Sequence, residues 1–238
     1  MKDTTAAYQR LQALILEEGC PVCHLSQEAA TTYLDTILWE SSTDLNVHEL
    51  LTASLGFCGR HSRELLAFGG QRPAAAVVER SSLLAAIRRL PELVADAGSP
   101  PPSQFRLWGV RHQPQARKGE QPPLPDSIKP CPACVRQIDE ESRGIKILLA
   151  HLEEFTSPLL TAGGLCLPHF LQAVSIANHT EREALLNIQQ SVWATLAENL
   201  DEFIRKQMHH HHGEPISEPA RQAVERTIDG LTGLYPVR

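Results

Sequence analysis

A short motif, Cys-Pro-x-Cys, occurs twice in this chain, and each copy is followed by a second motif, Gly-x-Cys-x-x-His. The spacings are C-x2-C-x34-C-x2-H and C-x2-C-x31-C-x2-H, and together they use all six cysteines of the chain. The side chains concerned are, in order, Cys20, Cys23, Cys58 and His61, then Cys131, Cys134, Cys166 and His169. A chain with two such sets must fold so that segments distant in sequence bring these side chains together.

The two copies indicate an internal duplication. Residues 51–61 align without a gap with residues 159–169, at an offset of 108 positions. Self-similarity at a fixed offset is evidence about the whole fold, because each copy is expected to form the same supersecondary unit. We therefore predict a first repeat over residues 1–97 and a second over residues 131–208, joined by a linker at 98–130. A tail at 209–238 carries one further predicted helix.

Local patterns favour helices throughout, so we predict an all-α fold with one Cys3His site stapling each half. Aromatic residues make up only 5% of the chain, and runs of β-branched and aromatic residues typical of strands are missing. Pro21 suits the first turn of a helix. Thr180 and Glu183 have the spacing of a capping box. Pro91 is expected to kink or shorten the helix that contains it.

Three cysteines and one histidine form a donor set that binds Zn²⁺ tetrahedrally. A C-x2-C pair supplies two ligands from one turn, and a cysteine at a helix start is stabilised as thiolate by the helix dipole. We expect one zinc ion at Cys20, Cys23, Cys58 and His61, and a second at Cys131, Cys134, Cys166 and His169. A site closed by four protein ligands has no open position for a substrate, which is typical of structural zinc.

Three alternatives share these residues. The sequence from Cys20 to His24 matches the C-x-x-C-H pattern of c-type haem attachment, but the second copy has Val135 in place of the histidine. The Cys-Pro-x-Cys pairs could act as redox-active dithiols, although such pairs usually lie beside a strand and both flanks here are helical. An iron–sulfur cluster also accepts this donor set, and spacing does not exclude it.

Composition and missing motifs narrow the function further. The net charge of −6 argues against a general nucleic-acid binder. No membrane span and no secretory signal is expected from the sequence, so the predicted compartment is the cytoplasm, with reduced thiols. No nucleotide-binding loop, nucleophile elbow or H-E-x-x-H motif occurs, and we assign no catalytic residue. The run Asp139-Glu140-Glu141 is interpreted as a solvated helix face.

Two segments remain outside the repeats. The linker holds eight of the 17 prolines and five basic against two acidic residues, and it contains Phe105 and Trp108. We interpret it as a spacer whose apolar residues pack on a neighbouring domain, with binding of an anionic partner as the alternative. The histidine run His209 to His212 could bind metal, but we interpret it as an exposed run without a defined role.

The quoted motifs, CPVC with GFCGRH and CPAC with GLCLPH, resemble those of an uncharacterised family of bacterial domains of unknown function. The resemblance also includes the long helix ending near Asp201 to Lys206 and a tail ending Leu231-Thr232-Gly233. It covers most of the chain except the proline-rich linker. It implies a helical fold with the eight motif positions as metal ligands, and it brings no established activity.

The function predicted from the sequence is a zinc-binding helical protein that acts as a non-enzymatic interaction or regulatory module, with an unidentified protein as its partner. The alternative is a thiol-based redox sensor or oxidoreductase that uses the Cys-Pro-x-Cys pairs.

Overall fold

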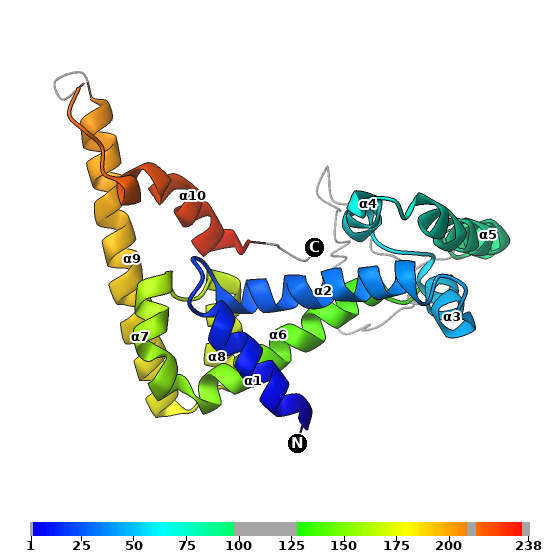
Figure 1. The fold of residues 1–238 in the computed structure, drawn as a ribbon, viewed down its shortest axis with the longest axis horizontal. Coiled ribbons are helices and arrows are strands. Elements are labelled where there is room, and N and C mark those ends of the chain that lie inside the picture. Colours follow the sequence, from blue (N-terminus) through cyan, green and yellow to red (C-terminus); the bar gives the residue numbers. More distant parts are fainter. Residues whose placement is uncertain (1, 98–127, 209–212, 235–238) are drawn as a thin grey trace, which may run out of the picture. The chain divides into compact units, whose positions relative to one another are not determined.

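The computed structural model describes residues 2–97, 128–208 and 213–234, and these residues form ten helices and no strand, which confirms the all-α class (Figure 1). No helix within these ranges is long and apolar enough to cross a membrane. In chain order the helices are α1 (Lys2–Leu14), α2 (Pro21–Trp39), α3 (Leu45–Ser54), α4 (Gly59–Ala67), α5 (Arg72–Ala97), α6 (Pro132–Ala150), α7 (Leu152–Ala162), α8 (Leu167–Ile176), α9 (His179–Gln207) and α10 (Glu218–Thr232).

The chain forms two compact units, one of residues 1–32 with 134–238 and one of residues 33–133. The first unit contains α1, the start of α2, most of α6, and α7 to α10. The second contains the end of α2 and α3 to α5. The repeat boundaries at 97 and 131 were drawn from the duplicated pattern and stay a prediction. The linker residues 98–127, with Phe105 and Trp108, and the histidines at 209–212 lie outside the described residues.

The core of the first unit is aliphatic, with one central aromatic ring. Apolar residues recur at helical spacing on α1, α6, α7 and α9, so each helix turns one stripe inward. The stripes meet in a continuous cluster of buried side chains that includes Leu11, Leu148, Phe155, Leu159 and Leu185. Three of the motif cysteines, Cys20, Cys23 and Cys166, belong to the same cluster and are therefore continuous with the core.

Helices α2 and α6 run in opposite directions where they meet in the first unit. Leu25, early in α2, lies over Gly144, late in α6: a Cβ on Gly144 would be 2.7 Å from Cδ2 of Leu25. Gln27, two residues further along α2, accepts a hydrogen bond of 3.4 Å from Gln137, early in α6. Each helix therefore begins near the end where the other finishes.

The N-terminal cap of helix α9 lies two residues earlier than predicted. Asn178, not Thr180, precedes the helix with an extended backbone, and its side chain accepts a hydrogen bond from the Glu181 amide at 3.0 Å. The Glu181 carboxylate in turn accepts from the Asn178 amide at 2.8 Å. The capping box is therefore real but is formed by Asn178 and Glu181, because asparagine caps at least as well as threonine.

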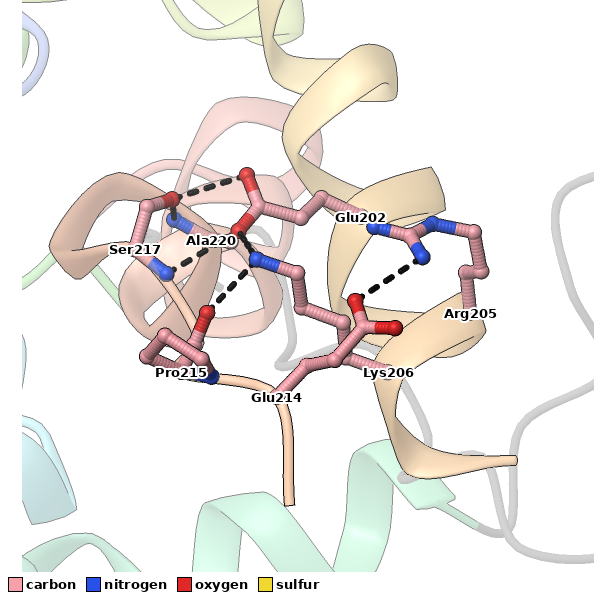
Figure 2. A network of polar contacts seen from close by, with 7 residues as sticks. All are labelled: Glu202, Arg205, Lys206, Glu214, Pro215, Ser217 and Ala220. Carbon is pink, nitrogen blue, oxygen red and sulfur yellow. Dashed lines mark hydrogen bonds and ion pairs between the residues drawn. The ribbon is translucent and has the colours of Figure 1, made fainter. Parts of the chain in front are cut away.

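The turn from α9 into α10 is held by a polar network around Glu202 (Figure 2). Its carboxylate accepts from the Lys206 ammonium at 2.7 Å and from the backbone amide and hydroxyl of Ser217 at 3.0 and 2.9 Å. Lys206 also donates to the carbonyl of Pro215 at 2.6 Å, and the Ser217 hydroxyl caps α10 by accepting from Ala220. These contacts tie the first turn of α10 to the last turns of α9.

The second unit packs the end of α2 against α3, α4 and α5. Its buried side chains include Leu34 and Leu38 from α2, Leu65 from α4 and Ala75 from α5. Pro91 lies inside α5, which continues to Ala97, so the expectation that this proline shortens the helix is wrong.

The segment that leads into α4 turns sharply at Gly56. This glycine has φ of +101°, a conformation that side-chain-bearing residues rarely adopt. A Cβ there would also lie 2.9 Å from Cβ of Ser82 on α5. The close approach of α5 and the positive φ explain why the motif ending in Cys58 and His61 begins with glycine.

Candidate metal centres

All eight motif residues lie at four helix starts with the same local geometry. At each start a cysteine is the last residue before the helix, and the second motif residue is the third residue of the helix. The pairs are Cys20 and Cys23 at α2, Cys58 and His61 at α4, Cys131 and Cys134 at α6, and Cys166 and His169 at α8. Side chains at these two positions lie on the same side of the first turn, as in a capping box. Cys58 and Cys166 make no side-chain cap hydrogen bond.

The first group brings together the starts of α2 and α8, with Cys20, Cys23, Cys166 and His169 all buried. The Nδ1 atom of His169 lies 3.1 Å from Sγ of Cys166 and 3.4 Å from Sγ of both Cys20 and Cys23. The sulfurs of Cys23 and Cys166 are 3.7 Å apart. All four donor atoms lie within 4.8 Å of one another, so they could hold one metal ion.

The second group consists of Cys58, His61, Cys131 and Cys134, the starts of α4 and α6. Nδ1 of His61 lies 3.3 Å from Sγ of Cys58 and 3.5 Å from Sγ of Cys131. The donor atoms again lie within 4.8 Å of one another. His61 is buried, whereas the three cysteines are half-buried, so this group is less shielded than the first.

The pairing predicted within each copy is wrong, because each Cys-Pro-x-Cys pair groups with the second motif of the other copy. Helix α2 has 19 residues and therefore carries the chain about 28 Å from Cys20 before α3 and α4 follow. The motif with Cys58 and His61 is thus delivered at the far end of α2. Since α6 runs opposite to α2, that is also where α6 begins with Cys131 and Cys134.

The donor set fits a cation. All six cysteines lie within the described residues, and none of them forms a disulfide there. Burial by itself lowers the pKa of His169, but the sulfurs of Cys166, Cys20 and Cys23 and the Glu141 carboxylate together raise that pKa well above its ordinary value. The same electron-rich groups would favour a metal cation in place of the proton on that ring.

The first group has outer contacts that orient its ligands. Oε1 of Glu141 lies 3.6 Å from Nε2 of His169, the ring nitrogen that faces away from the sulfurs. A carboxylate on the distal nitrogen fixes the tautomer and ring orientation of a metal-binding histidine. The buried Gln189 side chain accepts from the amide of Leu165 at 3.1 Å and donates to its carbonyl at 2.9 Å. Gln189 therefore holds the loop that delivers Cys166.

The end of α10 covers the first group. A Cβ on Gly233 would lie 3.5 Å from Sγ of Cys23 and 3.6 Å from Sγ of Cys166, and this glycine has φ of +85°. The next residue, Leu234, packs against the core of the first unit. The backbone after α10 thus lies directly over the two sulfurs, where a side chain would crowd them.

Sequence reasoning identified the eight motif residues but missed these supporting contacts. The prediction of a solvated face at Asp139 to Glu141 is wrong for two of the three residues. Glu140 is buried and Glu141 faces His169, whereas Asp139 is exposed. Its place two helical turns after Cys134 does not mark Glu141 as a partner of His169, because Cys134 belongs to the other group. No local pattern marks Gln189 or Gly233.

One family matches the chain over its whole length, residues 1–238, and it is described as a family of unknown function (DUF6062). Comparison with curated proteins and with solved structures gives no match.

Proposed function

Because the chain belongs to a family of unknown function (DUF6062), we propose its role from its own residues: a zinc-binding helical protein, held together by two structural Cys3His sites, that acts as a non-enzymatic interaction or regulatory module. The observation that carries the proposal is the convergence of four helix starts into two groups, each with its four donor atoms within 4.8 Å of one another. The proposed zinc ligands are the eight residues of these groups.

Distances in the first group suit a single ion. Zinc–sulfur bonds of about 2.3 Å in a tetrahedron place two sulfurs about 3.8 Å apart. The sulfurs of Cys23 and Cys166 are separated by 3.7 Å. An iron–sulfur cluster sets several metal and sulfide atoms between its cysteine ligands and therefore needs a wider arrangement. These distances favour zinc over a cluster.

Two features support a structural role: each metal group supplies all four ligands, and its ligands come from segments far apart in the sequence. Four protein donors leave no coordination position for a substrate. Each group joins segments far apart along the chain: Cys20 and His169 are 149 residues apart, and His61 and Cys131 are 70 apart. Metal binding would therefore cross-link helices that the chain connects only through long intervening segments. Thiolate ligands require a reducing compartment, and we propose the cytoplasm, with a protein as the partner.

A redox role is the second candidate, and the distance between Cys23 and Cys166 supports it. Their sulfurs, 3.7 Å apart, could form a disulfide after loss of the metal, with a peroxide as the oxidant that takes up the two electrons and two protons. Such a bond would join the two motifs of one group and would leave Cys20 reduced. The redox candidate therefore differs from a dithiol enzyme, in which the two cysteines of one Cys-Pro-x-Cys pair would react with each other.

Metal analysis combined with thiol titration tests both candidates on the full chain. We expect two zinc ions per chain, six thiols titratable after denaturation in chelator, and cooperative loss of helix when the metal is removed. Structural zinc contributes on the order of 10 kcal/mol in small zinc domains, comparable with the net stability of a folded domain. A metal-free protein that is fully folded and cycles between dithiol and disulfide would refute the structural-zinc proposal and favour the redox candidate.

A further inference from the structure

A cavity of about 850 Å³ lies within the first unit, between the end of α7, the middle of α9 and one face of α10. Its volume is in the range of small-molecule sites, which usually combine an apolar lining with a few polar groups. The proposed structural role of the zinc sites does not involve this cavity. Its lining has apolar residues on the side of α9 and charged residues on the side of α10.

On the α9 side of the cavity, apolar residues share the lining with three polar ones. Helix α9 contributes Val192, Trp193 and Leu196, and the loop before α8 contributes the buried Leu165. Trp193 is half-buried, and its Nε1 atom would be 3.8 Å from a Cβ on Gly230 of α10. The missing side chain at Gly230 therefore leaves the indole accessible from the cavity. An aromatic face is also attractive to an organic cation.

The outer side carries charge, and its cations are already paired. Arg226 forms an ion pair with Glu18 at 2.9 Å, and Arg221 forms one with Glu218 at 3.0 Å. Glu225 and Asp229 have no ion pair with any residue that the structure describes. They are four residues apart on α10, on the face that lines the cavity. The uncompensated charge of the lining is therefore negative.

Cys20 and Cys166 of the first metal group also line the cavity. A zinc ion with three thiolates and one neutral imidazole carries a formal charge of −1. The metal group would then add to the negative potential that Glu225 and Asp229 create in the cavity. Only this contribution depends on the proposed zinc function; the lining by Trp193, Glu225 and Asp229 does not.

We propose that this cavity binds a small organic cation with an apolar body, such as an alkylated amine. Its ammonium group lies between Glu225 and Asp229, and its apolar body lies against Val192, Trp193 and Leu196. The two carboxylates are hydrated, so their attraction for the ammonium group contributes little free energy and serves mainly to select a cation over a neutral or anionic ligand. Burial of the apolar body supplies most of the affinity.

Three probes of matched chain length test the proposal: octyltrimethylammonium, octanol and octanoate. Binding is measured by calorimetry and by the fluorescence of Trp193 in a Trp39→Phe/Trp108→Phe background. We expect saturable binding with affinity in the order ammonium, alcohol, carboxylate. Glu225→Gln and Asp229→Asn should each weaken ammonium binding about threefold and leave octanol unchanged, as expected for partly exposed ion pairs. Glu198→Gln, on the exposed face of α9 outside the cavity, is the matched control and should change nothing.

Equal affinity for the three probes, or ammonium binding that is insensitive to both carboxylate substitutions, would overturn the proposal. Zinc content measured on the same samples separates it from the proposed function. Two zinc ions per chain without ammonium binding refute the cavity assignment alone. Selective ammonium binding by a folded protein without zinc refutes the zinc function and leaves the cavity assignment in place.

Discussion

At the scale of single residues, every ligand pair of the candidate metal centres occupies the same two positions: the residue before a helix and the third residue within it. The backbone amides of a first helical turn point toward that position, and the partial positive charge of the helix end favours thiolate. In Cys58 and Cys166 the side chain makes no cap hydrogen bond, which leaves the sulfur available to the group. Residues that contact these ligands, such as Glu141, then determine how firmly the ligands are held.

Substitution of Glu141 tests whether such a contact strengthens metal binding. Replacing it with glutamine keeps its size but removes the charge that faces Nε2 of His169 at 3.6 Å. We expect Glu141→Gln to lower the zinc affinity of the first group about 10- to 100-fold, as seen for outer-shell partners of metal-binding histidines. Competition with a chromophoric chelator measures this, with Asp139→Asn on the exposed side of α6 as the control. If both variants retain zinc equally, Glu141 does not support the ligand.

At the scale of elements, α10 matters most, because it contributes to two features of the first unit. Its start is tied to α9 by the network around Glu202, which also includes an ion pair of 3.1 Å between Arg205 and Glu214 (Figure 2). Its end places Gly233 over the sulfurs of Cys23 and Cys166. Between these points its inner face lines the cavity. Loosening α10 should therefore expose the first group and open the cavity together.

The attachment of α10 should depend on pH through Glu202. The Lys206 ammonium, and then the amide and hydroxyl of Ser217, lower the pKa of Glu202 to about 2. Because the folded-state pKa lies below the unfolded value of about 4.5, this group stabilises the fold above pH 4.5 and loses its effect as the pH falls toward 2. We expect the difference in melting temperature between the wild type and Glu202→Gln to be largest at neutral pH and to close below pH 4.5.

Acid also protonates the cysteines and releases metal, but that loss is common to both proteins and cancels in the difference. Hydrogen exchange of α10 amides at pH 7 gives a second readout, since Glu202→Gln should speed exchange there before it affects α6. A difference in melting temperature that is independent of pH would contradict the assignment.

At the scale of the whole molecule, the central feature is the exchange of motifs between the two copies. Each candidate centre takes one Cys-Pro-x-Cys pair from one copy and one Gly-x-Cys-x-x-His motif from the other. The opposite directions of α2 and α6 account for this, since each helix ends where the other begins. Neither copy of the duplicated pattern therefore forms a metal group from its own four residues alone.

Paired substitutions test the exchange by counting zinc. We expect Cys20→Ser/Cys166→Ser to retain one zinc ion per chain, because both residues belong to the first group. Cys20→Ser/Cys58→Ser should retain none, because it damages both groups. Pairing within each copy predicts the opposite result, with one ion left in the second variant. Elemental analysis of purified protein distinguishes the two outcomes, and each single variant, expected to keep one ion, serves as the control.

The sequence alone was sufficient for the helical class, the helix start at Pro21, a helix in the C-terminal tail, and the residues that form the two candidate metal groups. Such features depend on local chemistry: proline in a first turn, and cysteine and histidine at fixed short spacing. Short-range rules also mark where a cap belongs, although Asn178 took the place expected for Thr180.

Tertiary structure decided which motifs meet, and it alone showed the roles of Glu141, Gln189 and Gly233. Two copies of one pattern have equal local preferences for either partner, so spacing cannot choose between pairing within a copy and pairing across copies. The choice comes from the packing of the helices, which places Cys20 and Cys23 beside Cys166 and His169. That geometry is set by packing between helices distant in sequence, and no local motif encodes it.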